Sequence, residues 1–191
     1  MERVTAYLGI GSNLGCREEN LAAAIQRLND GPVDSESPSP ATSAHVANTI
    51  NVLRSSSVYQ TAPWGLEDQP DFLNCVIEVG TQLPPAGLLE RAIAVEETLG
   101  RQPGLRYGPR LIDVDILLYG SMVVEQPDLE IPHPRLHLRA FALIPLAELA
   151  SELIHPVLNL TVGQLAQRVE GQDGVTLWGP PPMVLTGGFS T

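Results

Sequence analysis

The order of strand-like and helix-like segments is the feature that most restricts how this chain can fold. Four segments rich in apolar and β-branched residues are typical of strands, at 4–11, 50–61, 72–82 and 111–120. Two segments with helical periodicity lie between them, at 16–28 and 86–100. The order β-α-β-β-α-β predicts an α+β fold with a ferredoxin-like core, in which an antiparallel sheet carries both helices on one face.

The spacing of apolar residues and the residue types at the helix ends support the two helices. In the first helix the apolar side chains form one stripe, made by Leu21, Ala24, Ile25 and Leu28. The second helix follows Pro84 and Pro85, which suit a first helical turn, and it ends at Gly100, a residue type common at helix C-termini. With both helices on one face, the other face of the sheet needs a cover from later segments or stays open to a ligand.

The rest of the chain adds to this core and does not form a second domain. A chain of 191 residues has room for one domain with a sizeable core. We expect this domain to span 1–170, with C-terminal additions to the ferredoxin-like core. Residues 30–48 are rich in Pro, Ser, Asp and Ala without periodicity, which predicts a mobile surface loop. The tail, 171–191, is expected to be poorly ordered.

Three shorter segments follow the last core strand. "SMVVEQ" (121–126) is expected to form a hairpin with the strand at 111–120. "IPHPRLHLRAFALIPLAELA" (131–150) starts with prolines and ends with a helical pattern. "TVGQLAQRV" (161–169) predicts a short helix.

Charge and composition exclude several classes of function. A formal net charge of -11 and a pI near 4.6 argue against broad binding to nucleic acid or to an acidic membrane. All eleven basic residues are arginine, so mechanisms that need a lysine, such as the P-loop, are excluded. The glycines of "LGIGSNLG" (8–15) are interpreted as a tight strand-to-helix turn. Because the chain has no lysine, any phosphate must be bound by arginine, whose planar guanidinium suits bidentate contact.

The cysteines and the hydropathy pattern predict a cytoplasmic protein. Cys16 and Cys75 do not make a disulfide framework, which fits a reducing compartment. No apolar run approaches the ~20 residues needed to span a bilayer. The N-terminus has a glutamate where a signal peptide has its basic region. We therefore expect no membrane association.

The stretch "RYGPRLIDVDILLYG" (106–120) places two acids in what otherwise reads as a buried strand. Side chains two residues apart in a strand point to the same face, so Asp113 and Asp115 project together. Two carboxylates this close repel each other unless they share a cation, and Mg²⁺ favours one or two carboxylates plus substrate phosphates. The alternative is a strand whose acids face solvent or pair with arginines.

Three of the eleven basic residues precede these acids closely, at Arg101, Arg106 and Arg110. The glycines and prolines between them predict a loop whose backbone can approach a ligand. Arginines and a carboxylate-bound metal are the parts needed to bind and neutralise a polyphosphate. The alternative is that the arginines only neutralise the two acids.

A second candidate region, "TAPWGLEDQPDFLN" (61–74), combines aromatic and amide side chains. Trp64 lies in a Pro/Gly loop, while Phe72 and Asn74 lie on the same face of the following strand. Aromatic faces with an amide nearby suit a flat heterocycle that offers hydrogen-bond donors and acceptors. The alternative is a set of ordinary core aromatics beside a turn.

Five segments match, in order, the blocks of a known family: "IGSNLG", "SSVYQTAPWG", "DQPDFLN", "GPRLIDVDILLYG" and "IPHPRLHLRAFALIPL". They resemble the 6-hydroxymethyl-7,8-dihydropterin pyrophosphokinase family of folate biosynthesis. The resemblance covers residues 4 to 150, and that family's ferredoxin-like fold agrees with the element order above. It implies transfer of pyrophosphate from ATP to the hydroxymethyl group of the pterin, giving the pterin diphosphate and AMP.

The resemblance also implies roles for the matching residues. The family's catalytic positions correspond to Arg101, Arg110, Asp113 and Asp115, of which the two acids would hold two Mg²⁺ ions. The ATP-binding positions correspond to Glu96, Arg101, Tyr107, Arg110, Ile116, Ile131, His133 and Arg139. The pterin-binding positions correspond to Thr61, Ala62, Trp64, Phe72, Asn74, Asp113 and Phe141. Phe72 and Phe141 would lie on either side of the pterin ring.

The implied partners are ATP and the pterin, without nucleic acid or membrane, and we expect a monomer. Two other functions stay open. The residues at 61–74 also fit a Mg²⁺-dependent kinase for another small heterocyclic alcohol. A catalytically silent nucleotide- or pterin-binding module is the other alternative, because the family usually has an arginine where this chain has Pro103 and a tryptophan where it has Tyr107.

Overall fold

The computed structural model describes residues 2–30, 50–63, 65, 68–101 and 108–182. Its helices are α1 (Arg17–Asp30), α2 (Pro85–Thr98), α3 (Ala140–Ala150) and α4 (Val162–Arg168). Its strands are β1 (Val4–Ser12), β2 (Ile50–Ser55), β3 (Val58–Thr61), β4 (Phe72–Thr81), β5 (Asp113–Tyr119), β6 (Val124–Gln126), β7 (Leu129–Ile131) and β8 (Val175–Gly179). Within these described ranges, no helix is both long and apolar enough to cross a membrane.

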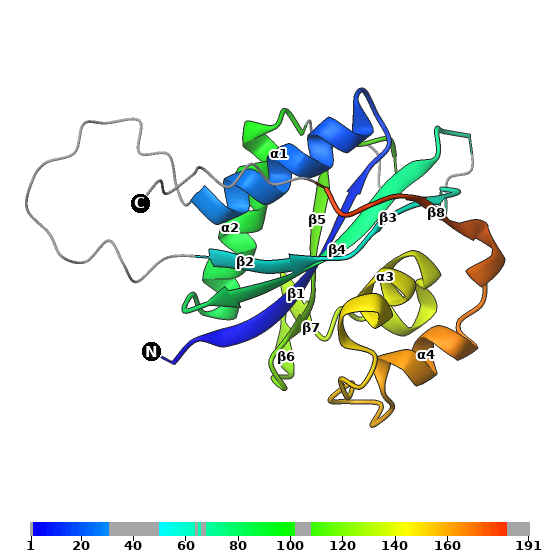
Figure 1. Ribbon diagram of the computed structural model, residues 1–191. Coiled ribbons are helices and arrows are strands. Elements are labelled where there is room, and N and C mark those ends of the chain that lie inside the picture. The colour runs from blue at the N-terminus through cyan, green and yellow to red at the C-terminus, as the bar shows by residue number, and fades with distance from the viewer. Residues whose placement is uncertain (1, 31–49, 64, 66–67, 102–107, 183–191) are drawn as a thin grey trace, which may run out of the picture.

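The strand order confirms the predicted ferredoxin-like core. The main sheet has the order β5-β1-β4-β3-β8, β2 pairs with β4 as well, and every pairing is antiparallel. Each of α1 and α2 therefore connects two strands that have one other strand between them, which is the split β-α-β arrangement. Both helices lie on one face of the sheet, and α3 and α4 lie on the other (Figure 1).

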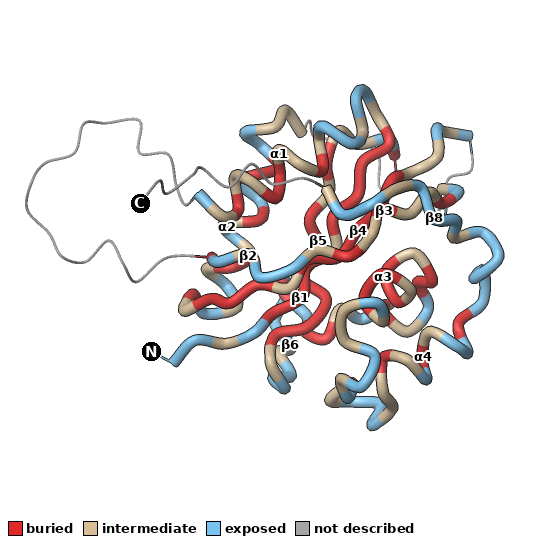
Figure 2. Tube along the Cα trace, viewed as in Figure 1, coloured by how far each residue is buried: buried red, intermediate tan, exposed pale blue. Residues whose placement is uncertain are grey.

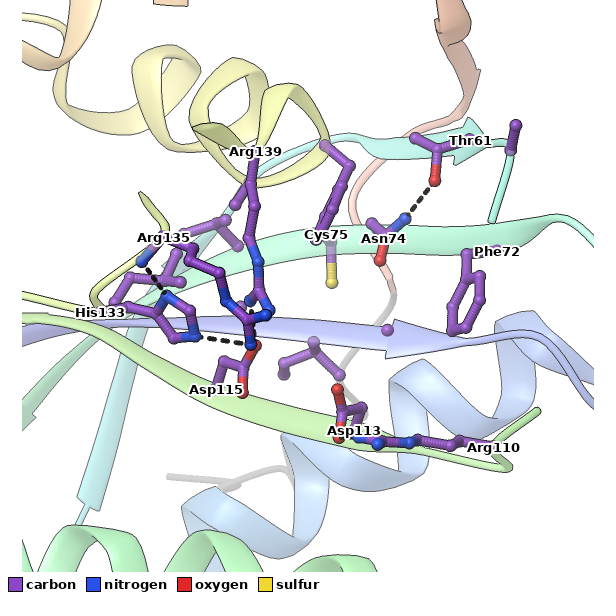
Figure 3. Close-up of a pocket in the computed structure, with 18 of the residues that line it drawn as sticks. Thr61, Phe72, Asn74, Cys75, Arg110, Asp113, Asp115, His133, Arg135 and Arg139 are labelled. Atoms are coloured by element: carbon purple, nitrogen blue, oxygen red, sulfur yellow. Dashed lines mark hydrogen bonds and ion pairs between the residues drawn. The ribbon is translucent and has the colours of Figure 1, made fainter. Parts of the chain in front are cut away.

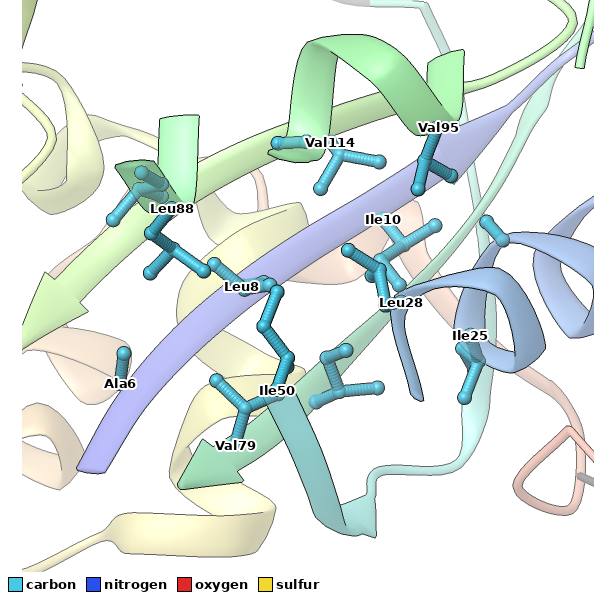
Figure 4. Packing of buried hydrophobic residues seen from close by; sticks show 14 of the residues in the cluster. Ala6, Leu8, Ile10, Ile25, Leu28, Ile50, Val79, Leu88, Val95 and Val114 are labelled. Carbon is cyan, nitrogen blue, oxygen red and sulfur yellow. The ribbon is translucent and has the colours of Figure 1, made fainter. Parts of the chain in front are cut away.

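The helix-covered face holds the larger core. The predicted stripe of α1 is fully buried, and it packs with Leu8 and Ile10 of β1 and with Val95 of α2 (Figure 4). Both end signals of α2 are confirmed. Pro85 is its first residue, and Gly100 after its end has a φ of 89°, in the left-handed region that glycine adopts readily.

Later segments cover the opposite face, as the sequence requires. Leu143 and Leu146 of α3 and Val162 of α4 form a second buried cluster with Tyr7 of β1 and Leu117 of β5. The sheet is thus buried on both sides along its middle strands (Figure 2). The segment 131–150 starts irregularly and ends in α3, and 161–169 contains α4, so both of these predictions are confirmed.

Two strand predictions need correction. The segment 50–61 is not one strand, because Ser56 interrupts it between β2 and β3. The Ser56 backbone N–H donates to the Val76 carbonyl at 2.8 Å, and its Oγ accepts from the Val76 N–H at 2.9 Å. The second correction concerns β6, which pairs with β7 and not with β5. Pro127 and Asp128 form a turn directly after β6 and fold it back onto β7.

The expectation of a poorly ordered tail is wrong for residues 175–179, which form β8. This strand pairs with β3, and the Trp178 Nε1–H donates to Glu18 Oε1 at 2.8 Å. The Trp178 ring also lies 5.3 Å from the Arg17 guanidinium carbon. The end of the tail, 183–191, and the predicted loop beyond Asp30 lie outside the described residues.

Candidate active site

A cavity of about 230 Å³ lies between the sheet and the segment that leads into α3 (Figure 3). β1, β3, β4 and β5 supply its floor, and residues 133–142 supply its cover. Ten residues singled out in the sequence line it: Thr61, Ala62, Phe72, Asn74, Arg110, Asp113, Asp115, His133, Arg139 and Phe141. The structure therefore brings the two candidate regions together on one side of the sheet.

The alternation of β5 explains how a buried strand carries two acids. Val114 and Ile116 point to the helix-covered core and are about 95% buried. Asp113 and Asp115 point the other way, to the cavity. The cost of burying two carboxylates is thus reduced by an open cavity on their side and by the basic residues around them.

Arginine partners surround Asp113. The Arg110 Nη1 donates to Asp113 Oδ1 at 2.5 Å, and the Arg101 Nη1 lies 3.2 Å from the same oxygen. Burial raises the pKa of Asp113, and the Asp115 carboxylate raises it further, while Arg110 and Arg101 act in the opposite direction. Arg101 also forms an ion pair with the buried Glu96. The arginines therefore neutralise the acid, as the simpler alternative predicted, but they do so at the wall of a cavity.

Asp115 has a different set of basic neighbours. The Arg139 Nη1 donates to Asp115 Oδ2 at 2.7 Å, and the His133 Nε2 lies 3.8 Å from it. Burial lowers the pKa of His133 to about 4, and the Arg139 charge adds to this effect. The imidazole is therefore neutral at physiological pH, and Arg139 supplies the positive charge. The Arg139 guanidinium also lies over the Phe141 ring, 5.4 Å from its centre.

The other end of the cavity carries the amide and the aromatic rings. Asn74 is 7% exposed, and its Nδ2 donates to Thr61 Oγ1 at 2.7 Å. This hydrogen bond fixes the amide plane of Asn74 against the cavity (Figure 3). Phe72 on β4 and Phe141 on α3 line the cavity from the sheet and from its cover. The arrangement suits a flat polar ring.

The remaining predicted residues do not line the cavity, or they lie outside the described ranges. Ile116 and Ile131 belong to the helix-side core, and Glu96 and Arg101 do not line the cavity. Glu96 Oε1 accepts the Val114 N–H at 2.7 Å, so it holds β5 from behind. Other candidates lie outside the described residues: Trp64, Arg106 and Tyr107.

The cavity residues that the sequence reasoning missed include Gly9, Gly11 and Arg135. Both glycines lie within β1, as the predicted strand at 4–11 requires, but no role in the site was assigned to them. Their spacing of two residues in a strand was the available signal, because it places them on one face. Arg135 follows the candidate His133 by two residues, and this short separation was its only signal.

Glu96 gives the fold a pH dependence. Burial raises the pKa of this carboxyl from 4.5 to about 7, so the folded protein binds a proton that the unfolded chain releases. The contribution of Glu96 to the free energy of unfolding is therefore expected to fall as the pH rises from about 4.5 to about 7, by on the order of 3 kcal/mol. His133, whose pKa is lowered, contributes in the opposite direction over the same range. Glu96→Gln keeps an acceptor for the Val114 N–H and removes only the Glu96 contribution, so the free energy of unfolding of wild type minus that of the variant should fall by this amount. Urea unfolding at pH 4.5, 6 and 7.5 in EDTA checks it, and parallel profiles for both proteins would contradict it.

Comparison with known proteins identifies a family. The family model described as 7,8-dihydro-6-hydroxymethylpterin-pyrophosphokinase (HPPK) matches residues 7–151. A 2-amino-4-hydroxy-6-hydroxymethyldihydropteridine pyrophosphokinase from Methylorubrum extorquens is 40% identical over 149 residues, which cover 78% of this chain and 84% of that protein. The protein of the same name from Bacillus subtilis is 38% identical over 173 residues, which cover 91% of this chain and 89% of that protein.

Solved structures agree with the fold. Wild-type HPPK-DHPS from Plasmodium falciparum with pteroate superposes with a TM-score of 0.64 over 87% of this chain, at 14% sequence identity. The match covers 44% of that longer chain, so this chain spans less than half of its length. At this identity the likeness concerns the fold alone. The family model and the two relatives show that the chain belongs to the 7,8-dihydro-6-hydroxymethylpterin-pyrophosphokinase family.

Proposed function

We propose that this chain transfers the terminal pyrophosphoryl group of ATP to the hydroxymethyl group of 6-hydroxymethyl-7,8-dihydropterin, a step of folate biosynthesis. The observation that carries the proposal is one cavity that joins an amide and aromatic rings to two carboxylates flanked by arginines. Membership of the family and the names of the two relatives support the choice of substrate and reaction.

The cavity residues divide into a ring-binding end and a phosphate-binding end. Asn74 offers an amide donor and acceptor to the polar edge of the pterin, and Phe72 and Phe141 offer their faces to the ring. Arg110 and Arg139 offer guanidinium groups to the phosphates of ATP. Such positioning brings the hydroxymethyl oxygen and the β-phosphorus together, which is the main contribution of proteins to phosphoryl transfer.

The reaction forms one bond and breaks one. The hydroxymethyl oxygen attacks the β-phosphorus, and the bond from the β-phosphorus to the oxygen of the α-phosphate breaks. AMP leaves with that oxygen and its electron pair, and the hydroxyl proton is released. Arg110 and Arg139 offset the negative charge that develops on the phosphoryl oxygens and on the leaving AMP.

The residues present fit Mg²⁺ as the metal of this reaction. Asp113 and Asp115 are two carboxylates on one strand face, at the wall of a cavity with arginines for phosphate. This is the donor set that Mg²⁺ takes together with phosphate oxygens, and we propose that the two acids hold two ions. Bound Mg²⁺ would neutralise charge on the phosphates. Arg110 and Arg139, which pair with the acids in the free protein, would then be available to the phosphates.

Product analysis tests the proposed reaction. With ATP, Mg²⁺ and 6-hydroxymethyl-7,8-dihydropterin, the protein is expected to form AMP and the pterin diphosphate in equal amounts. ADP and a pterin monophosphate would favour a kinase for a heterocyclic alcohol instead. Tight nucleotide binding without either product would favour the silent binding module. We further propose that the protein acts as a monomer in the cytoplasm, which gel filtration and fractionation of the source cells can check.

A further inference from the structure

The floor of the cavity is built from two rows of residues that cross the sheet. In the first row Gly11 of β1 pairs with Asn74 of β4 on one side and with Asp113 of β5 on the other. In the second row Gly9 lies between Val76 and Asp115. β1 therefore separates the ring-binding amide from the carboxylates, and in both rows its residue has no side chain.

The backbone conformation does not require glycine at position 11. The glycines with a positive φ are Gly15, Gly65, Gly100, Gly120 and Gly171 among the described residues, and Gly11 is not one of them. An alanine at position 11 would thus keep its backbone unstrained. What glycine provides at this position is space, and not a special φ.

The space at Gly11 is taken up by Asn74. A Cβ built on Gly11 lies 2.7 Å from Asn74 Oδ1 and 3.7 Å from Phe72 Cδ1. The first distance is too short for a carbon and an oxygen that do not bond. The Asn74 amide cannot move away freely, because its Nδ2 is hydrogen-bonded to Thr61 Oγ1. By contrast, the three atoms nearest to a Cβ on Gly9 all belong to the Leu117 side chain, at 3.4 Å or more.

We propose that Gly11 is a positioning residue for pterin recognition, because its missing side chain lets the Asn74 amide lie against β1 in the orientation fixed by Thr61. The inference rests on the proposed function for the identity of the ligand. A methyl group at position 11 would turn the amide and break its bond to Thr61, so the donor and acceptor would no longer face the ring. The ring-binding end is affected, while Arg110 and Arg139 stay in place.

Equilibrium binding separates this role from a general loss of structure. With Mg²⁺ and a non-hydrolysable ATP analogue bound, the Kd of 6-hydroxymethyl-7,8-dihydropterin should rise at least about tenfold in Gly11→Ala. The Kd of the ATP analogue measured alone should change less than about twofold. The control is Gly80→Ala at the other end of β4. The three atoms nearest to the new Cβ there belong to the flexible Arg3 side chain, the first at 2.9 Å, and this variant should bind the pterin like wild type.

A double-variant cycle tests whether the effect passes through Asn74. In the Asn74→Ala background, where Oδ1 is gone, adding Gly11→Ala should change the pterin Kd less than about threefold. Should Gly11→Ala not fold alone, Gly11→Ala/Asn74→Ala should still fold, since the overlap is removed. Unchanged pterin affinity in Gly11→Ala, additive effects in the cycle, or a double variant that does not fold would each overturn the inference. Absence of pterin binding in wild type would instead contradict the proposed function.

Discussion

Asp113→Ala and Asp115→Ala are each expected to lower kcat at least about a thousandfold, which corresponds to roughly 4 kcal/mol of lost transition-state stabilisation. The reason is that each variant removes one of the two carboxylates proposed to hold Mg²⁺ beside the phosphates. Arg110 and Arg139 do not compensate for the lost Mg²⁺ charge, because the transition state needs their positive charges in addition to those of the metal.

The fold of these variants should stay intact. Burial and the neighbouring Asp115 carboxylate raise the pKa of Asp113, so the ionised form of this acid is not held in a strongly favourable environment. Their side chains remain 26% and 36% exposed, while the Arg139 partner of Asp115 is buried. We therefore expect the free energy of unfolding to fall by at most about 3 kcal/mol, which leaves the domain folded. Steady-state kinetics and urea unfolding measure the two effects.

Asp128→Ala is the matched control for charge. Asp128 is exposed in the turn between β6 and β7 and does not line the cavity. This variant loses the same negative charge and should keep wild-type kcat within about twofold. Retained activity in both Asp113→Ala and Asp115→Ala would contradict the two-metal proposal.

Leu8→Ala is expected to have the largest effect on stability. Leu8 is fully buried in the middle of β1, within the core between the sheet and the helices α1 and α2. Its truncation leaves a cavity there and should lower the free energy of unfolding by about 2–5 kcal/mol. Chemical unfolding with a tryptophan or circular-dichroism signal measures the change.

Leu53→Ala gives the comparison for this core position. Leu53 on β2 is 44% exposed, so its truncation should cost less than about 1 kcal/mol. Equal losses in Leu8→Ala and Leu53→Ala would contradict the position of the core. A loss of activity in Leu8→Ala at temperatures where it is fully folded would show that β1 transmits the defect to the cavity floor.

The core fold followed from local patterns because its segments have clear periods. The stripe of α1, the proline and glycine at the ends of α2 and the alternation around Asp113 and Asp115 each depend on nearby residues only. β8 did not follow in this way. Its side chains are mostly exposed, and it is held by backbone pairing with β3 and by contacts of Trp178, which no local pattern reveals.

Part of the candidate site could be predicted, because some of its polar residues stand out in segments that otherwise have the apolar pattern of a buried strand. Asp113, Asp115 and Asn74 are polar residues within buried strands, so the sequence singles them out. Gly9 and Gly11 contribute through the absence of a side chain, and their effect depends on strand neighbours far away in the sequence. The roles assigned to Glu96, Ile116 and Ile131, which lie behind the cavity, stay predictions. The role of Arg101, which contacts Asp113 but does not line the cavity, also stays a prediction.

The fate of the β-phosphorus of ATP tests the central claim most directly. ATP labelled with ³²P at the β-position is incubated with the protein, Mg²⁺ and 6-hydroxymethyl-7,8-dihydropterin, and the products are separated by chromatography. Pyrophosphoryl transfer predicts that the label moves to the pterin product and that the AMP formed is unlabelled. Label retained in ADP, with an unlabelled pterin product, would contradict it.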